Sequence, residues 1–404
     1  MAAGYATAPA QASYDVVIVG GAIMGSATAW FLTEEADFDG RVLVVERAPG
    51  YAESATARTN SCIRQQFSHP LNIRLSQFTA RFIRDLPARM GDARAPSIAI
   101  ENFGYLYLVA SEAAAELLRA NAEVQRAAGA ETELLTPAEI AARYPFYALD
   151  DVVLGSINTR DEGYWDGGTL FEWLRRSARA RGVEYVAGEV VAMERAGGRV
   201  THLRLASGDR VACGQVVNAA GPRAAQVAAM AGIDDLPVEP RKRYSWVFRA
   251  AEPLPATLPL TIDPSGVHVR QDGPGAYLAG AAPDPDLAAD PDDFALDPAR
   301  WEEHVWPILA ARIPAFEAIR VVSEWAGHYD FNTLDQNAIL GPHPDVPNFF
   351  FQNGFSGHGL QQSPGMGRGM AELLTHGEYR SLDLSPFGYK RVAAGRPMLE
   401  RAVI

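Results

Sequence analysis

A nearly unbroken run of apolar and small residues lies close to the start of the chain. Residues 14–19 form a short apolar run, a glycine-rich turn follows at 20–25, and residues 26–32 are again small or apolar. An apolar run that ends at glycine predicts a buried strand, and the stretch after the turn predicts a helix packed on that strand. A second apolar run, at residues 42–45, predicts a parallel strand beside the first.

The turn at residues 20–25 has the residue types of a dinucleotide-binding turn. Gly20 permits the tight turn, Gly25 lets the helix pack closely, and unpaired N–H groups at the helix N-terminus attract phosphate. Ala22 stands where that pattern has its second glycine, so a methyl group must fit beside the pyrophosphate. Glu46, after the second strand, is placed to bind a ribose 2′-hydroxyl, which favours FAD or NAD over NADP. The alternative is an ordinary buried strand-to-helix turn.

Helical and strand-like patterns alternate along the middle of the chain. Residues 53–67 are small and polar without clean periodicity, which is typical of a loop that lines a site. The other predicted elements are a helix at about 72–85, strand-like alternation at 97–110, a helix from Ser111 to Gly129, a helix from the Thr136 capping box to Pro145, a strand at 182–188, a hairpin turn at 207–209 and a strand at 216–222. We interpret the helices between 111 and 145 as part of a domain inserted into the first.

The last third of the chain predicts a second sheet and then a return to the first. Polar and apolar positions alternate between residues 237 and 280, and a helix is expected at 300–312. Between them, residues 283–298 hold six aspartates among prolines and alanines, which predicts a solvated loop or, alternatively, a lid. The final elements are an apolar strand at 348–352 and a helix that ends near His376, with Ser363 as its N-cap and Pro364 in its first position.

Composition narrows the class of protein. The 404 residues suffice for two domains, and 48% hydrophobic with 21% charged residues is an ordinary globular composition. A net charge of −13 disfavours nucleic acid and anionic membranes as main partners. Two cysteines, Cys62 and Cys213, make no disulfide framework, which favours a reducing compartment.

Targeting and membrane signals are not evident in the sequence. Residues 1–13 contain no basic residue and no long apolar core, so we expect neither a secretory signal nor a transit peptide, and a cytoplasmic location is favoured. Residues 16–32 carry no charge but include three glycines, and a strand with a packed helix explains them better than a membrane span. No transmembrane segment is therefore predicted.

Two stretches carry candidate chemistry. Arg64 lies in the polar stretch at 53–67, where a guanidinium group can bind a substrate carboxylate through two parallel hydrogen bonds; the alternative is an arginine that only solvates the surface. Three glycines surround His358 just ahead of the last predicted helix. They suit close packing against a flat polar ring, and the helix end can stabilise negative charge on it. Alternatively, His358 is a structural histidine.

Three segments together resemble the FAD-binding segments of the D-amino-acid oxidase/sarcosine oxidase family of flavoproteins. They are the 20–25 turn with Glu46, the strand end at 218–221 and residues 354–359. A subgroup of this family, tied to assembly of respiratory complex I, is similar over further segments at residues 61–68, 238–244, 325–330, 341–344 and 385–387. The resemblance covers nearly the whole chain. Because no mitochondrial presequence is evident, a bacterial-type member is expected.

The resemblance implies the fold and its division into domains. It implies an α/β fold in which a Rossmann-like FAD-binding domain is joined to an α+β substrate domain with a mixed sheet, as in glutathione-reductase-like and D-amino-acid oxidase architectures. The FAD-binding domain is expected at residues 14–95, 151–236 and 326–404, and the substrate-binding domain at 96–150 and 237–325. Non-covalent binding of FAD is expected.

The reaction implied by the resemblance is oxidation of the C–N bond of an amino acid or a secondary amine, such as an N-substituted amino acid. Hydride would pass from the substrate carbon to flavin N5, and water would hydrolyse the resulting imine. The electrons would then go to O2 or to an electron carrier. The expected partners are thus a small amine or amino acid and an electron acceptor, without nucleic acid and without a metal ion.

The resemblance also suggests roles for individual residues. Arg64 would hold the substrate carboxylate and His358 would be the active-site histidine, and the pocket candidates are Arg243, His268, Arg270, Tyr329 and Gln361. The candidates for binding FAD are Gly20, Gly21, Ala22, Ile23, Met24, Gly25, Glu46, Arg47, Ser54, Asn60, Ser61, Val190, Ala220, Gly221, Gly354, Gly357, His358, Gly359, Leu360 and Gln361. Alternatively, residues 241–243 form a solvated face or pair with the aspartate-rich loop.

Three positions depart from the family pattern. Gln361 stands where sarcosine oxidases have a carboxylate-binding lysine, so the same substrate is not implied. His328 stands where they attach flavin through a cysteine, and Leu278 replaces a lysine credited with activating oxygen, so a dehydrogenase fits as well as an oxidase. Two other classes stay open: an FAD-containing assembly or interaction protein without turnover, and an NAD-linked dehydrogenase, in which residues 354–359 would have no role.

Overall fold

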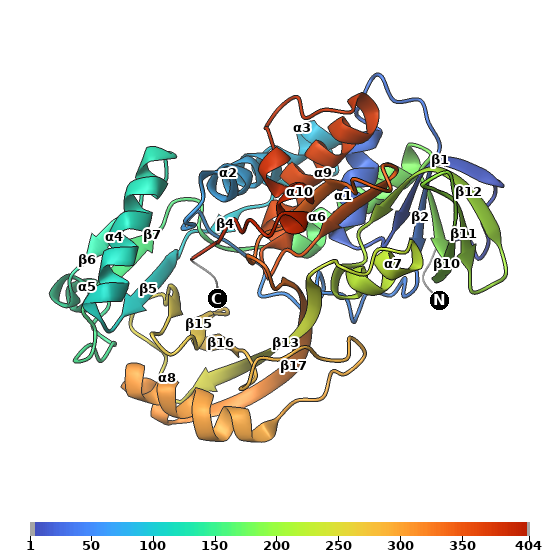
Figure 1. Cartoon of the computed structure of the whole chain (residues 1–404). Coiled ribbons are helices and arrows are strands. Elements are labelled where there is room, and N and C mark those ends of the chain that lie inside the picture. The colour runs from blue at the N-terminus through green and yellow to red at the C-terminus, as the bar shows by residue number, and fades with distance from the viewer. Residues whose placement is uncertain (1–4, 402–404) are drawn as a thin grey trace.

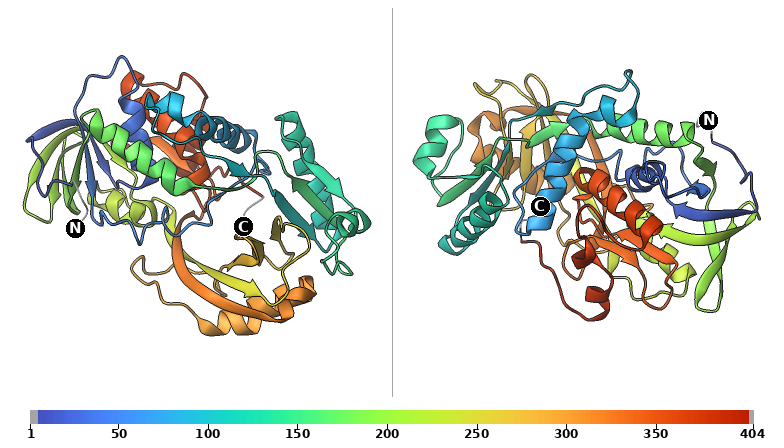
Figure 2. Two further views of the ribbon diagram at one scale, coloured as in Figure 1. Left: turned by 180° about the vertical axis from the view of Figure 1, so that it is seen from behind. Right: turned by 90° about the horizontal axis from the view of Figure 1, so that it is seen from above.

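The computed structural model of the chain describes residues 5–401. Its described part contains two eight-stranded sheets and one three-stranded sheet. Figure 1 shows the first large sheet on the right, around β1 and β2, and the second along the bottom and left, from β13 to β5. Figure 2 shows the same two parts from behind and from above, with the long strands β13 and β17 running between them.

The centre of the first sheet is parallel. Its neighbouring strands are β19 (Phe349–Asn353), β12 (Arg210–Asn218), β1 (Ser13–Val19), β2 (Val42–Glu46) and β9 (Glu184–Ala187). Antiparallel partners are added by β10 (Val190–Ala196), β11 (Arg199–Leu205) and β18 (Ile339–Pro342). The strands β1 and β2 are almost uniformly apolar because both faces of a parallel sheet are covered.

Helices and a β-meander cover the two faces of this sheet. One face packs against α1 (Ile23–Leu32), α2 (Pro70–Arg84), α3 (Leu86–Met90), α6 (Gly167–Ala180) and α9 (Gly359–His376). The other packs against α7 (Ala224–Met230) and the strands β10 and β11. The strand, glycine turn and helix that the sequence predicts at residues 14–32 are confirmed as β1 and α1.

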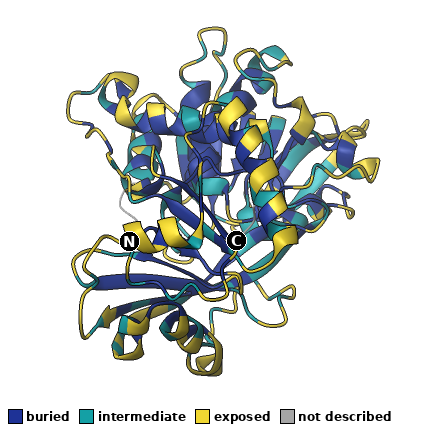
Figure 3. Cartoon of the chain, turned by 90° about the vertical axis from the view of Figure 1, so that its left-hand side faces the viewer, coloured by how far each residue is buried: buried dark blue, intermediate teal, exposed yellow. Residues whose placement is uncertain are grey.

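The second sheet is mixed, as the sequence predicts. Its order is β17 (Ile319–Asn332), β13 (Val238–Ala250), β16 (Ala276–Ala281), β15 (His268–Gln271), β14 (Leu260–Ile262), β5 (Tyr105–Val109), β7 (Leu154–Asn158) and β6 (Glu133–Leu135). Only β14 and β5 pair in parallel within it. Its helices are α4 (Glu112–Ala127), α5 (Pro137–Arg143) and α8 (Trp306–Arg312). A π-helical turn at Arg300–Val305 directly precedes α8. Figure 3 shows the buried strands at the centre and exposed helix faces at the periphery.

Small elements connect the two parts. The three-stranded sheet consists of β3 (Cys62–Ile63), β8 (Gly163–Trp165) and β4 (Ile100–Glu101). Short 3-10 turns lie at Gly221–Arg223, Pro314–Glu317 and Ser385–Phe387, and α10 spans Lys390–Ala393. The second sheet also extends beyond the boundaries that the sequence suggested. It takes up β7, which was assigned to the FAD-binding part from residue 151, and β17 continues past residue 326 to Asn332.

The last long helix begins earlier than the sequence predicts. The expected N-cap, Ser363, lies inside α9, which starts at Gly359 and has His358 as its N-cap residue. Pro364 is therefore an interior proline, whose missing N–H leaves the carbonyl of Leu360 without its helical donor. The hydroxyl of Ser363 donates to that carbonyl instead, at 2.9 Å. A serine followed by a proline is typical of a helix start. Here the helix continues through both residues, because the Ser363 hydroxyl supplies the hydrogen bond that Pro364 cannot make.

The contact between α1 and α9 gives a test of packing. A Cβ on Gly367 would lie 2.6 Å from Ala27 Cβ and 3.0 Å from the Thr28 backbone nitrogen, so Gly367→Ala must push the two helices apart. We expect a loss of about 1–3 kcal/mol in the free energy of unfolding, measured by urea denaturation of the FAD-loaded protein. Gly50→Ala is the control, because a Cβ there meets nothing within 4 Å. Equal stability of the two variants would contradict this packing.

Candidate active site

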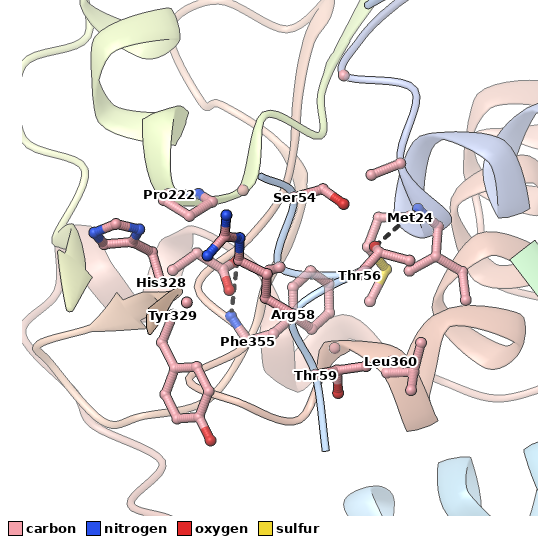
Figure 4. A pocket seen from close by; sticks show the side chains of 18 of the residues that line it. Met24, Ser54, Thr56, Arg58, Thr59, Pro222, His328, Tyr329, Phe355 and Leu360 are labelled. Atoms are coloured by element: carbon pink, nitrogen blue, oxygen red, sulfur yellow. Dashed lines mark hydrogen bonds between the residues drawn. The ribbon is translucent and has the colours of Figure 1, made fainter. Parts of the chain in front are cut away.

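One cavity joins the segments that the sequence singled out. It lies at the carboxyl ends of β1, β2 and β12, where open α/β sheets bind ligands. The turn after β1, Glu46, Gly221 and residues 355–361 all line it. Figure 4 shows side chains from these segments, including Met24, Pro222 and Leu360, around the same space.

The turn after β1 is closely packed and aimed at the end of β2. Gly20 has a φ of +103°, and a Cβ on Gly25 would collide with the carbonyl oxygen of Gly20, so both positions require glycine. The Oε2 atom of Glu46 accepts a hydrogen bond from Gly21 N at 2.8 Å, and its Oε1 atom accepts one from Ala48 N at 2.8 Å. The carboxylate that the sequence assigned to ribose binding is therefore held beside the turn.

Two helix N-termini face this cavity. Neither N-cap residue, Ala22 of α1 or His358 of α9, caps its helix with its own side chain, and the first residues of both helices line the cavity. A helix N-terminus carries a partial positive charge and unpaired N–H groups. The cavity therefore favours negative charge at two separate places.

Arg64 and His358 form a buried pair on the wall of the cavity. The Nη2 atom of Arg64 lies 3.0 Å from Nε2 of His358, Nη1 donates to the carbonyl oxygen of Gln66, and the guanidinium carbon lies 4.0 Å from the centre of the Phe67 ring. The backbone N–H of Arg64 also donates to Oε1 of Gln361 at 2.8 Å. Gln361 thus positions the segment that carries Arg64.

The hydrogen bond from Arg64 determines the protonation of His358. Because a guanidinium group only donates, Nε2 of His358 accepts, and the neutral ring carries its proton on Nδ1. Burial, and then the charge of Arg64, lower the pKa of His358 well below its usual value. His358 is therefore a neutral imidazole beside a buried cation.

A buried carboxyl group supports the Arg64 segment from behind. Glu162 is fully buried, and Oε1 accepts from Gln65 N at 2.5 Å, from Gln66 N at 3.1 Å and from Asn158 Nδ2 at 3.0 Å. Burial raises the pKa of Glu162 to about 7, although these hydrogen bonds and the charge of Arg64 act in the opposite direction. Glu162 fixes the backbone on which Arg64 stands.

The opposite wall comes from the second sheet. Nδ2 of Asn60 donates to Nε2 of His268 at 2.9 Å, and burial, with the charges of Arg243 and Arg270, lowers the pKa of His268 to about 4. Arg243 lies 4.6 Å from the centre of the Tyr329 ring and is held by both carboxylate oxygens of Asp286 at 3.0 Å. His268 is therefore neutral, and the charge of Arg243 is already paired.

The loop before α9 is pinned to the end of β17. Oδ2 of Asp330 accepts from Gly354 N at 2.8 Å and from Phe355 N at 3.2 Å, while burial raises the pKa of Asp330 to about 6. A Cβ on Gly357 would overlap the ring of Tyr329, so this ring packs directly against the loop backbone. The last strand of the second sheet thus positions the loop that carries His358.

The candidates from the sequence divide into those that line the cavity and those behind its wall. Arg64, Arg243, His268, Tyr329, His358 and Gln361 all line it. The cofactor candidates that line it are Gly20, Ala22, Ile23, Met24, Glu46, Arg47, Ser54, Asn60, Val190, Ala220, Gly221, Gly357, His358, Gly359, Leu360 and Gln361. Gly21, Gly25, Ser61, Arg270 and Gly354 do not line it. The assigned roles of the lining residues stay predictions.

The candidate residues that lie behind the cavity wall make contacts that support the wall. Ser61 donates its hydroxyl to the Trp165 carbonyl at 2.6 Å, and Nη1 of Arg270 pairs with Asp272 at 2.7 Å. Gly354 uses its N–H for Asp330. All three cations at residues 241–243 pair with acids, and Lys242 and Arg243 pair with the aspartate-rich loop within 3.0 Å, while the pocket role of Arg243, which also lines the cavity, stays a prediction.

Several site residues escaped the sequence analysis. Thr56 accepts from the Ile23 N–H at 3.3 Å, and Arg58 donates to the Ala326 carbonyl at 2.7 Å, so the polar stretch contributes more than the predicted Ser54, Asn60, Ser61 and Arg64. Tyr105 also lines the cavity. The sequence contained no indication of the buried acids Glu162 and Asp330. They act because they are buried against distant backbone N–H groups, and a local sequence pattern does not show burial.

The cavity fits FAD. It is continuous from the Gly20 turn, where Glu46 and the N-terminus of α1 suit a ribose and phosphates, to the N-terminus of α9, which suits a ring that carries negative charge. His328, which also lines it, is 4% exposed and uncharged, because burial lowers the pKa of its ring.

Comparisons with known proteins identify the family. Residues 15–373 match the family described as FAD dependent oxidoreductase. The chain belongs to this family of FAD-dependent oxidoreductases. The match confirms FAD as the cofactor, and it confirms the resemblance to the D-amino-acid oxidase/sarcosine oxidase family.

Individual relatives of this oxidoreductase cover nearly its whole length. FAD-dependent oxidoreductase domain-containing protein 1 of Xenopus laevis is 39% identical, over 96% of this chain and 85% of the relative. Sarcosine oxidase subunit beta of Rhizobium meliloti is 26% identical, over 90% and 85%. The crystal structure of L-proline dehydrogenase from P. horikoshii shares the fold, with a TM-score of 0.81 and 24% identity over 95% of this chain and 99% of that one.

No helix within residues 5–401 combines the length and the apolar character needed to cross a membrane. In the same residues, no group of three or more His, Cys, Asp or Glu side chains is arranged to hold a metal ion.

Glu162 predicts a particular pH dependence of stability. In the folded oxidoreductase this carboxyl keeps its proton up to about pH 7, whereas its ordinary pKa is 4.5. Between these values the folded state binds more protons, so the contribution of Glu162 to stability falls as the pH rises. Glu162→Gln should remove this fall, measured by urea unfolding from pH 4.5 to 7.

The control for this measurement is Glu133→Gln. Glu133 pairs with Arg143, which lowers the pKa of the Glu133 carboxyl, so its titration lies below the chosen range. The control should keep the pH dependence of the unmodified protein. An identical pH dependence in Glu162→Gln and the control would contradict a raised pKa at Glu162.

Proposed function

We propose that this flavoprotein oxidises the C–N bond of an α-amino acid or of a secondary amine that carries a carboxylate, such as an N-substituted amino acid. The observation that carries the proposal is the Arg64–His358 pair at the N-terminus of α9, in the same cavity as the dinucleotide turn. FAD, when bound, supplies the redox chemistry by accepting the hydride that the substrate carbon loses.

Arg64 is suited to hold the carboxylate of the substrate. Its side chain is 2% exposed and lines the cavity, and a buried guanidinium group attracts a carboxylate strongly because little water screens the charge. Contacts with Gln66, Phe67 and His358 fix its orientation before a substrate arrives.

Two histidines of the cavity accommodate an amine without adding positive charge. His358 and His268 are both neutral, for the reasons given above. A neutral imidazole beside the substrate accepts or donates a hydrogen bond and does not repel an amine that carries a proton. Tyr105 and Leu260, which are nearly buried, supply apolar walls for a side chain or an N-substituent.

The names of two relatives support this class of substrate. Sarcosine and L-proline, which those names contain, are both secondary amines with a carboxylate. One of these relatives is called an oxidase and the other a dehydrogenase, so the electron acceptor of this chain is left to experiment.

Anaerobic reduction of the bound flavin tests the proposal. The purified holoprotein is mixed without oxygen with N-methyl amino acids, N-carboxyalkyl amino acids, cyclic secondary amino acids, and D- and L-amino acids, and flavin bleaching is followed at its visible absorbance band. Rapid bleaching by at least one compound is expected. Admission of air then separates an oxidase, which recovers its colour quickly, from a dehydrogenase. Absence of bleaching by every compound would contradict turnover and favour an FAD-containing assembly or interaction protein.

Arg64→Ala tests the carboxylate site. For the best substrate, we expect kcat/KM to fall roughly a hundredfold or more, which corresponds to a loss of about 3 kcal/mol of transition-state stabilisation. The matched control is the same amine without its carboxylate, whose kcat/KM should be low and nearly unchanged by the substitution. Arg64→Lys keeps the charge but not the planar pair of donors, so its kcat/KM should lie between the values of the unmodified protein and of Arg64→Ala. An equal loss for both amines would remove the carboxylate role of Arg64.

A further inference from the structure

The aspartate-rich loop, predicted as a solvated loop or a lid, crosses between the two parts of the molecule. We call residues 284–297 the strap. It connects β16 to the helical segment that starts at Arg300, and it contains no helix or strand apart from a single β-bridge between Ala288 and Arg241. Its contacts with both large sheets set it apart from an ordinary surface loop.

Contacts to β13 hold the strap to the second sheet. Asp286 receives two hydrogen bonds from Arg243, and the Nζ atom of Lys242 lies 2.6 Å from Oδ2 of Asp293. The backbone N–H of Ala289 donates to the carbonyl of Pro240 at 2.9 Å. The strap is therefore fixed along its length to one strand.

The middle of the strap reaches the first sheet. Oδ1 of Asp292 accepts from Nη2 of Arg47 at 2.9 Å, and it also accepts from Nη2 of Arg223. Arg47 directly follows β2, and Arg223 lies beyond the end of β12. Because β2 and β12 are the two neighbours of β1, Asp292 links the two sides of the crevice into which the Gly20 turn opens.

The inner side of the strap is part of the cavity wall. Pro291 and Phe294 line the same cavity as the dinucleotide turn. The Phe294 ring lies 4.3 Å from the guanidinium carbon of Arg58 and makes an edge contact with the His328 ring, with centroids 4.8 Å apart. The backbone of Asp290, which is also in the strap, interacts with the His328 ring, so the strap covers this part of the cavity wall.

We propose that the strap is a salt-sensitive latch that retains FAD. Arg47 after β2 and Arg223 after β12 both line the cavity, Asp292 joins these two arginines, and Phe294 adds its ring to the cavity wall. FAD then leaves only when the bond between Asp292 and these arginines opens. The inference rests on FAD binding and not on the substrate or reaction proposed above.

The exposure of the latch explains its expected sensitivity to salt. The side chain of Asp292 is 56% exposed, and that of Arg47 is 33% exposed. Ion pairs in contact with water weaken as ionic strength rises, because dissolved ions screen the charges. The pairs at Asp292 should therefore open more often in high salt, whereas the ring contacts of the half-buried Phe294 should change less.

The experiment measures the rate of FAD release. The holoprotein is diluted until rebinding of FAD is negligible, and the release of FAD is followed by the rise of free flavin fluorescence in 0.05 and 0.5 M NaCl, both chosen for the assay. Asp292→Asn should release FAD about fivefold faster or more at low salt. The unmodified protein should release FAD faster at high salt, and Asp292→Asn should show little of this salt dependence.

Asp284→Asn is the matched control. Asp284 lies on the same strap, its side chain is 76% exposed, and its nearest cation, Nη1 of Arg300, is 3.8 Å away on the side of the second sheet. This variant should release FAD at the unmodified rate. Equal rates for both variants at low salt would overturn the proposal, as would flavin that stays attached to the denatured protein, because a covalent bond would then retain FAD without the strap. None of these outcomes depends on finding a substrate.

Discussion

The close packing of α1 against α9 is the constraint on which the site depends. Ala27 and Gly367 let the two helices approach until their backbones are nearly in contact. Each helix begins at the cavity, α1 after the Gly20 turn and α9 after the loop of His358. Two positive helix ends, far apart in the sequence, are thereby held at a fixed separation along one cofactor site.

The order of strands supplies the rest of the site. Because β12, β1 and β2 are parallel neighbours, the small residues after β12 and Glu46 after β2 emerge at the same edge as the Gly20 turn. The second sheet adds the other wall through His268, Arg243 and Tyr329. Neither sheet forms the cavity alone, so the chemistry of the site depends on how the two sheets are joined.

The sequence predicted this arrangement where local pattern and chemistry coincide. The strand, turn and helix at residues 14–32 carry both an apolar run and glycines with a defined task, and the structure has these elements there. The predicted start of α9 at Ser363 was wrong, because Ser363 and Pro364 are usual at a helix start. Here the Ser363 hydroxyl replaces the hydrogen bond that Pro364 removes, and the helix begins at Gly359. Glu162, Asp330 and the link at Asp292 escaped prediction because they depend on partners more than a dozen residues away in the chain.

The pairing of β13 with β17 has a consequence for how molecules reach the chamber. These strands stay in register from Val238 opposite Asn332 to Ala250 opposite Ile319, with one irregularity after Val247, and the near end of this ribbon packs against Gly354 beside the His358 loop. A continuous two-stranded ribbon resists bending far more than a single linking chain does. Opening and closing by a hinge between the two halves is therefore disfavoured, and a substrate must enter, and a product leave, through the rearrangement of side chains and loops around a rigid frame.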